Sequence, residues 1–61
     1  MGKKIKQLRK AQGLTQDKLA EKVRVSSAYI GFIEQGQRNP SLKTLDKIAR
    51  ALGTKMSELL E

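Results

Sequence analysis

The side chains of this sequence that could do chemistry are mostly cations and amides, rather than nucleophiles or metal ligands. The chain of 61 residues holds 13 Lys and Arg against 6 Asp and Glu, and it contains neither His nor Cys. It can therefore form no disulfide and none of the usual soft metal sites. Asp17 and Glu21 lie four residues apart on one predicted helix, but beside Lys18 and Lys22, which is typical of solvated surface charge. We expect neither an enzyme nor a bound cofactor or metal ion.

The positive charge is the most prominent chemical property of the chain. Its formal net charge is +7 at pH 7. Residues 1–30 hold eight Lys and Arg against two acidic residues, whereas residues 31–61 hold five against four. Such a surplus attracts polyanions, either nucleic acid or an acidic membrane surface. The membrane interpretation is the weaker one, because the basic residues are spread over several predicted helices instead of along one amphipathic face.

Targeting signals are not recognisable in the sequence. No apolar run is long enough to cross a bilayer, and the amino terminus has charge without the apolar segment of a signal peptide. We therefore expect a cytoplasmic, nucleoid-associated protein of a bacterium or archaeon.

The segment 16–35 predicts two short helices separated by a tight turn. Helix-forming residues end at Val23, Arg24 and Val25 interrupt them, and Ser26 offers a side-chain oxygen that can cap a second helix. The second helix has an inward face of Ile30 and Ile33. Its other face carries Ser27, Ala28, Tyr29, Gly31 and Phe32. This layout is typical of a helix-turn-helix, whose second helix lies in the DNA major groove.

The remaining elements are also predicted to be helical, which gives an all-α fold. Glycines that can adopt a left-handed conformation and residues that can cap a helix, among them Thr15, Ser41 and Thr54, divide the chain. The inward apolar stripes are expected to include Ile5, Leu8 and Ala11 or Gln12, then Leu42, Leu45, Ile48, Ala49 and Leu52, then Met56, Leu59 and Leu60. The predicted helices cover residues 3–12, 16–23, 27–35, 42–52 and 55–60. Together they predict one compact domain over residues 1–61.

The order of short motifs along the chain resembles that of a known family. Leu-Thr-Gln stands at 14–16, Ile-Glu-Gln-Gly at 33–36 and Asn-Pro-Ser at 39–41, and the similarity extends over residues 5–23, 25–53 and 56–60. The chain resembles the lambda-repressor/Cro-type (XRE) helix-turn-helix family. The resemblance implies a five-helix lambda-repressor-like bundle and a transcriptional regulator, commonly a repressor, that binds operator DNA. The alternative is a protein-binding adaptor or antitoxin that uses the same fold.

The resemblance also implies roles for individual residues. Base reading in the major groove is expected of Ser27, Ala28, Tyr29 and Phe32, although relatives often carry longer polar side chains there. An alternative for Phe32 is that it packs onto the core. Arg9 and Glu34 match a structural ion pair that ties the first helix to the third. Phosphate contacts are expected of Gln16, Ser26, Gln37, Arg38, Asn39 and Lys43. Gln16 is also expected to brace the recognition helix.

One recognition helix covers only a few base pairs, so a second copy is expected to complete the readout. Two copies about 34 Å apart, one helical turn, would require a palindromic operator. The candidate self-contact is formed by the Gly53–Thr54 loop and by three residues of the last helix, Met56, Leu59 and Leu60. The competing interpretation is that these three residues only cover the core of the monomer. In a chain of 61 residues little surface remains for a large interface, so we expect a weak homodimer that DNA strengthens.

Overall fold

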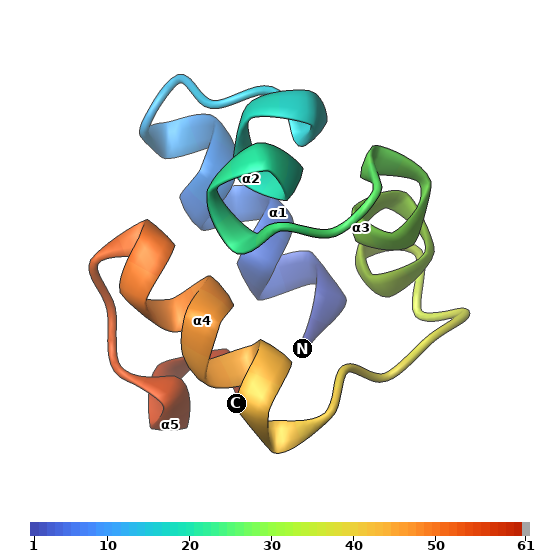
Figure 1. Cartoon of the computed structure of the whole chain (residues 1–61). Helices are drawn as coiled ribbons and strands as arrows, with labels where there is room; N and C mark the ends of the chain where they lie inside the picture. Colours follow the sequence, from blue (N-terminus) through green and yellow to red (C-terminus); the bar gives the residue numbers. More distant parts are fainter. Residues whose placement is uncertain (61) are drawn as a thin grey trace.

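Five α-helices account for the regular structure of residues 1–60, the part of the chain that the computed structural model describes (Figure 1). They are α1 (Gly2–Ala11), α2 (Gln16–Val23), α3 (Ser27–Glu34), α4 (Leu42–Leu52) and α5 (Met56–Leu59). α2 packs against α3 and α4, α1 packs against α3 and α5, and α4 also contacts α5. The predicted all-α, five-helix bundle is confirmed. No helix within residues 1–60 is both long and apolar enough to cross a membrane.

Side-chain caps fix the starts of three helices, as the sequence predicts. The Thr15 hydroxyl accepts a hydrogen bond of 3.0 Å from the Lys18 amide, and the Ser26 hydroxyl accepts one of 3.1 Å from the Tyr29 amide. Ser41 does the same for the Thr44 amide at 3.2 Å. Each bond satisfies an amide that has no partner within its own helix, and a cap of this kind contributes about 1 kcal/mol. The predicted starts of α2, α3 and α4 agree with the structure for this reason.

Five predicted helix ends were wrong by one residue, including both ends of α5, which was predicted over residues 55–60 and spans Met56–Leu59. α1 begins and ends one residue earlier than predicted, and α3 ends at Glu34 instead of residue 35. The prediction that Thr54 caps α5 was also wrong, because the helix begins at Met56 and its cap position is Lys55, which makes no side-chain cap bond. Thr54 lies one residue too early to reach an amide of the first turn. Its hydroxyl bonds the Glu58 carboxylate instead.

A single cluster of buried aliphatic side chains forms the core between the helices. Leu42 is 70% exposed and Leu60 is 57% exposed, so the prediction that both face inward was wrong. Leu42 is the first residue of α4, which begins at the lower edge of the molecule, and Leu60 follows the last residue of α5 (Figure 1). The buried residues are Ile5, Leu19, Ala20, Val23, Ile30, Ile33, Leu45, Ile48, Ala49, Leu52 and Leu59.

The inward stripe of α1 differs from the predicted one at its second half. Ile5 is buried and Leu8 packs partly against the core, but Ala11 and Gln12 are exposed. Arg9 is buried in their place, at 7% exposure. The side-chain amide of Gln12 bonds the Leu52 carbonyl, so this residue contributes a polar contact to the end of α4 rather than apolar packing.

Candidate nucleic-acid interface

α2 and α3 are joined by a tight turn that fixes the angle between them. Arg24 ends α2 in the left-handed conformation, with φ of 66°, and within residues 1–60 no other residue except glycine has a positive φ. The Val25 amide donates to the Ala20 carbonyl at 3.0 Å, and Ser26 then caps α3. Ala20 is 3% exposed, so its small side chain lies in the buried core. This arrangement is a helix-turn-helix.

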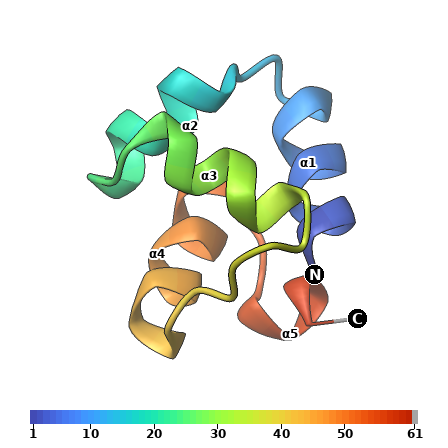
Figure 2. The same ribbon diagram turned by 90° about the vertical axis from the view of Figure 1, so that its right-hand side faces the viewer.

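A shallow groove of about 330 Å³ lies between the start of α2 and the exposed face of α3. Figure 2 shows α3 lying across the front of the molecule, with α2 beside it and the segment leading to α4 below. We name this surface the α2–α3 groove. It is lined by Gln16, Ser27, Ala28, Gly31, Phe32 and Gln35.

Three of the four residues predicted to read bases line the α2–α3 groove. They are Ser27, Ala28 and Phe32. Phe32 is 43% exposed, so it is available at the surface and the alternative that it packs into the core is wrong. Tyr29 is only partly exposed and packs against the core. It does not line the α2–α3 groove, and its exposure is intermediate.

Gln35 lines the α2–α3 groove and is absent from the predicted site. The sequence could have indicated Gln35, because it follows Ala28, Gly31 and Phe32 at the spacing of one helix face. The predicted base-reading residues ended at Phe32, whereas the exposed face continues to Gln35, the residue that follows α3.

Glu34 connects three helices through one carboxylate. Arg9 donates to it from Nε at 2.6 Å and from Nη2 at 3.1 Å. Nη1 of Arg9 donates to the Leu14 carbonyl at 2.8 Å, and Nε2 of Gln16 donates to Glu34 Oε1 at 3.0 Å. The side chains of Arg9 and Glu34 are 8% and 2% exposed. The structure thus brings the predicted ion pair together, and adds Gln16 to it.

The charge of Glu34 is maintained by its partners. Burial alone would raise the pKa of this carboxyl group, but hydrogen bonds from Arg9 and Gln16, with the positive charges of Arg9 and Lys6, outweigh burial and lower the pKa. Glu34 is therefore ionised at neutral pH and can hold both donors in place.

The remaining residues predicted to contact phosphates are exposed on either side of α3. Ser26 lies at its start, while Gln37, Arg38 and Asn39 follow its end and Lys43 lies in the first turn of α4. The Phe32 carbonyl accepts from the Gln37 amide at 2.8 Å and from the Arg38 amide at 3.3 Å. These bonds hold the start of the α3–α4 segment beside the end of α3.

The three residues predicted for a dimer contact differ in their availability. Leu59 is fully buried among the core residues of its own chain, so it cannot contribute to a surface contact. Met56 is partly buried against the same core, and Leu60 is exposed. The interpretation that these residues cover the core therefore holds for Leu59 and in part for Met56.

The geometry of the site defines the class of protein, and comparison with known proteins then gives its family. The two helices, their turn and the exposed face of α3 define a helix-turn-helix protein. A family described as Helix-turn-helix matches residues 5–59, and the chain belongs to this XRE-type family.

Relatives with a described role are regulators. The immunity repressor protein of Bacillus phage phi105 is 45% identical over 60 residues, which make up 98% of this chain and 42% of the repressor. The restriction-modification controller protein C.AhdI from Aeromonas hydrophila has a structure with a TM-score of 0.91 and 41% identity, over 95% of this chain and 88% of that one. The crystal structure of SinR, the master regulator for biofilm formation, in complex with DNA is also similar to this chain. There the TM-score is 0.92 and the identity 38%, over 98% of this chain and 97% of that one.

Proposed function

We propose that this protein is a sequence-specific DNA-binding transcriptional regulator, acting as a repressor, that reads the major groove with α3. The α2–α3 groove is the observation that carries this proposal, because it places the start of α2 beside the exposed face of the second helix of a helix-turn-helix. A helix presented in this way fits the major groove of B-DNA. The similarity to SinR in complex with DNA supports the same arrangement.

Base reading is assigned to the residues on the exposed face of α3. Ala28 and Phe32 can contact thymine methyl groups, and Ser27 and Gln35 carry polar groups that can bond base edges. Tyr29, which packs partly on the core, is a candidate for a phosphate or base contact through its hydroxyl.

Phosphate binding is assigned to polar and basic residues around that face. Gln16 begins α2, and the Nε2 atom that bonds Glu34 has a second hydrogen that can reach a phosphate. The other phosphate contacts are assigned to Ser26, Gln37, Arg38, Asn39 and Lys43. The net charge of +7 favours such contacts over the whole surface.

The regulator is proposed to bind as a homodimer on a palindromic operator, in the cytoplasm of a prokaryote. One α3 covers too few base pairs for high specificity, and two copies one helical turn apart double the readout. Leu60, with the exposed part of Met56, is the remaining candidate for the self-contact. A surface this small supports only weak association before DNA is bound.

A protein-binding role is the second candidate, because a large apolar side chain, that of Phe32, is exposed on α3. An adaptor would use this face to hold a partner protein rather than DNA.

Selection from a pool of random duplexes distinguishes the two functions. A DNA-binding dimer should enrich one palindromic sequence, and analytical ultracentrifugation should find two chains on each selected duplex. Enrichment of no sequence would contradict the DNA-binding proposal. One chain per duplex at saturation, on a site without symmetry, would contradict the dimer alone.

A further inference from the structure

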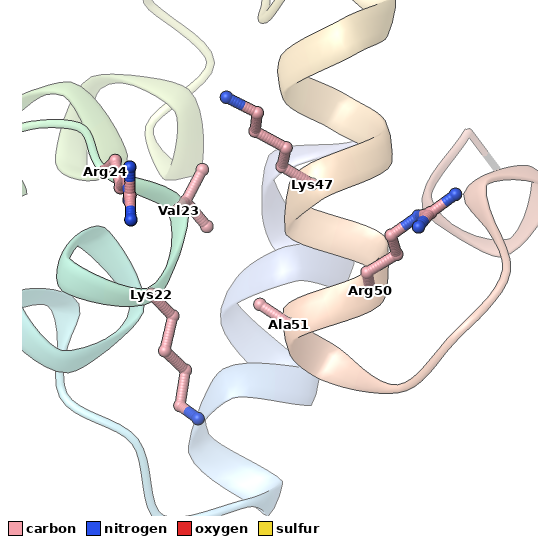
Figure 3. Close-up of a pocket in the computed structure, with 6 residues that line it drawn as sticks. All are labelled: Lys22, Val23, Arg24, Lys47, Arg50 and Ala51. Atoms are coloured by element: carbon pink, nitrogen blue, oxygen red, sulfur yellow. The ribbon is translucent and has the colours of Figure 1, made fainter.

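A second surface of the molecule collects basic side chains away from the α2–α3 groove. A pocket of about 560 Å³ lies between the end of α2 and the second half of α4, and Figure 3 shows the side chains that line it. We name it the basic pocket. It shares no residue with the α2–α3 groove, and its lining residues are Lys22, Val23, Arg24, Lys47, Arg50 and Ala51.

Most of the charge in the basic pocket has no partner within the chain. Arg50 pairs with Asp46 at 3.1 Å on the exposed surface of α4. Among residues 1–60, no carboxylate lies within ion-pair distance of Lys22, Arg24 or Lys47. Asp17 and Glu21, the acidic residues of α2, do not line the pocket. The three unpaired cations leave a positive field that an acidic ligand would complement.

Arg24 occupies its place in the basic pocket at a conformational cost. Its φ of 66° is left-handed, a conformation that glycine adopts without strain and other residues adopt at about 1 kcal/mol or more. Glycine would form this turn equally well. The side chain of Arg24 therefore adds a positive charge to the pocket that the local backbone does not require.

The arrangement of the cations indicates what kind of anion fits. In Figure 3 the amino groups of Lys22 and Lys47 point away from each other, and Arg50 extends to the far side of α4. The charged groups therefore do not converge on one point, as they would around a single phosphate. Ala51 lies between them and is partly exposed, whereas Val23 is buried at 2% exposure. Ala51 and the aliphatic stems of Lys22 and Lys47 therefore give the pocket an apolar floor.

We propose that the basic pocket docks an acidic segment of a partner protein. Carboxylates of the segment would bond Lys22, Arg24 and Lys47, and an apolar side chain between them would contact Ala51 and the aliphatic stems of the two lysines. Nucleic acid is also a polyanion, but an apolar floor offers nothing to a phosphate. This site lies at the opposite end of α2 from Gln16, so the partner could bind independently of DNA.

Fluorescence anisotropy with a labelled peptide tests this proposal. The probe is a short peptide of Glu and Ala residues with one central Leu, compared with the same peptide carrying Ser in place of Leu and with a random-sequence DNA duplex. The pocket variant combines Arg24→Gly with Lys47→Gln. The control variant combines Lys3→Gln with Lys55→Gln, which removes the same charge from exposed positions outside the pocket. Arg24→Gly suits the left-handed turn, so a melting curve should show that the fold is retained.

The pocket variant should bind the Leu peptide roughly fivefold more weakly than the wild type, as expected for two exposed charge contacts. The control variant should lose clearly less affinity, and the Ser peptide should bind the wild type more weakly than the Leu peptide. Equal losses in the two variants would show attraction by net charge alone and overturn the proposal. So would equal binding of the two peptides, or no binding of either. If the pocket variant weakens binding of the duplex as much as binding of the Leu peptide, the pocket binds DNA phosphates and the proposal is overturned.

Discussion

The Nε2 atom of Gln16 donates a hydrogen bond of 3.0 Å to Oε1 of Glu34, which ties the first residue of α2 to the last residue of α3. The other carboxylate oxygen of Glu34 accepts from Nε of Arg9 at 2.6 Å. A side chain proposed to contact a phosphate is therefore oriented by a buried carboxylate, and that carboxylate is in turn held by α1. The recognition surface and the stability of the bundle depend on the same three side chains.

Loss of the Glu34 carboxylate should destabilise the fold strongly. Glu34→Ala leaves Arg9 buried without its charged partner, and we expect a loss of about 3 kcal/mol in the free energy of unfolding. Adding Arg9→Met should recover part of that loss, because no buried charge then remains. Urea denaturation measures both changes.

The exposed pair of Arg50 and Asp46 provides the matched control. Its side chains are 81% and 47% exposed, so Asp46→Ala should change the free energy of unfolding by less than about 0.5 kcal/mol. Equal effects of Glu34→Ala and Asp46→Ala would show that the Glu34 network contributes no more than a surface pair.

The pKa of Glu34 makes part of the stability depend on pH. Because this pKa is lowered in the folded state, the unfolded chain takes up the proton first as the solution is acidified. The contribution of the carboxylate should be fully present above the unfolded pKa of about 4.3 and should be lost as the pH falls through the folded pKa. The stability difference between the wild type and Glu34→Gln, followed by thermal unfolding from neutral to acidic pH, should therefore be constant at first and then shrink. A difference that grows on acidification would have the wrong sign.

Gly31 lies inside α3, where glycine disfavours the helix. The atoms nearest to a Cβ atom at this position would belong to the side chain of Gln16, at 3.7 Å, which is an ordinary contact. Gly31→Ala should thus stabilise the fold by about 0.5–1 kcal/mol. A lower melting temperature in this variant would show that Gln16 needs the space.

Local signals in the sequence were sufficient to predict most of the fold. Thr15, Ser26 and Ser41 form their caps with amides three residues further on, and such contacts depend on neighbouring residues alone. α5 was less predictable, because a helix of four residues has too few positions for its apolar pattern to define a start. Leu42 and Leu60 share the spacing of their stripes, but their exposure depends on where neighbouring helices end, which spacing does not reveal.

The candidate site was predicted in its outline and not in its contacts. The exposed face of α3 followed from helical periodicity, and the pair of Arg9 and Glu34 was implied by the family resemblance. The resemblance implied that Gln16 braces the recognition helix, but not through which residue. The bond from Gln16 to Glu34 joins residues 18 positions apart, and neither side chain indicates the other in the sequence. The basic pocket was missed for the same reason, because Lys47 and Arg24 come together only when α4 packs on α2.

Salt should weaken the proposed DNA binding strongly. A dimer that makes roughly 6–8 phosphate contacts should show a slope of about −5 to −7 when the logarithm of affinity is plotted against that of salt concentration. Arg38→Gln should reduce the steepness by about 2, one contact for each chain of the dimer. A slope near zero for the wild type would contradict phosphate binding.

The affinities of the wild type and Phe32→Ala for a selected operator and a scrambled duplex, at one salt concentration, test the role of α3 most directly. Phe32 is 43% exposed and lines the α2–α3 groove, so its loss should leave the fold and the scrambled-site affinity unchanged. We predict that the ratio of the two affinities falls roughly tenfold, since two copies of α3 each lose a contact to the operator. Leu42→Ala, an exposed apolar change outside the groove, should leave the ratio unaltered. A Phe32→Ala variant that keeps the wild-type ratio, or that weakens both duplexes equally, would contradict base reading by Phe32 and the role proposed here for the α2–α3 groove.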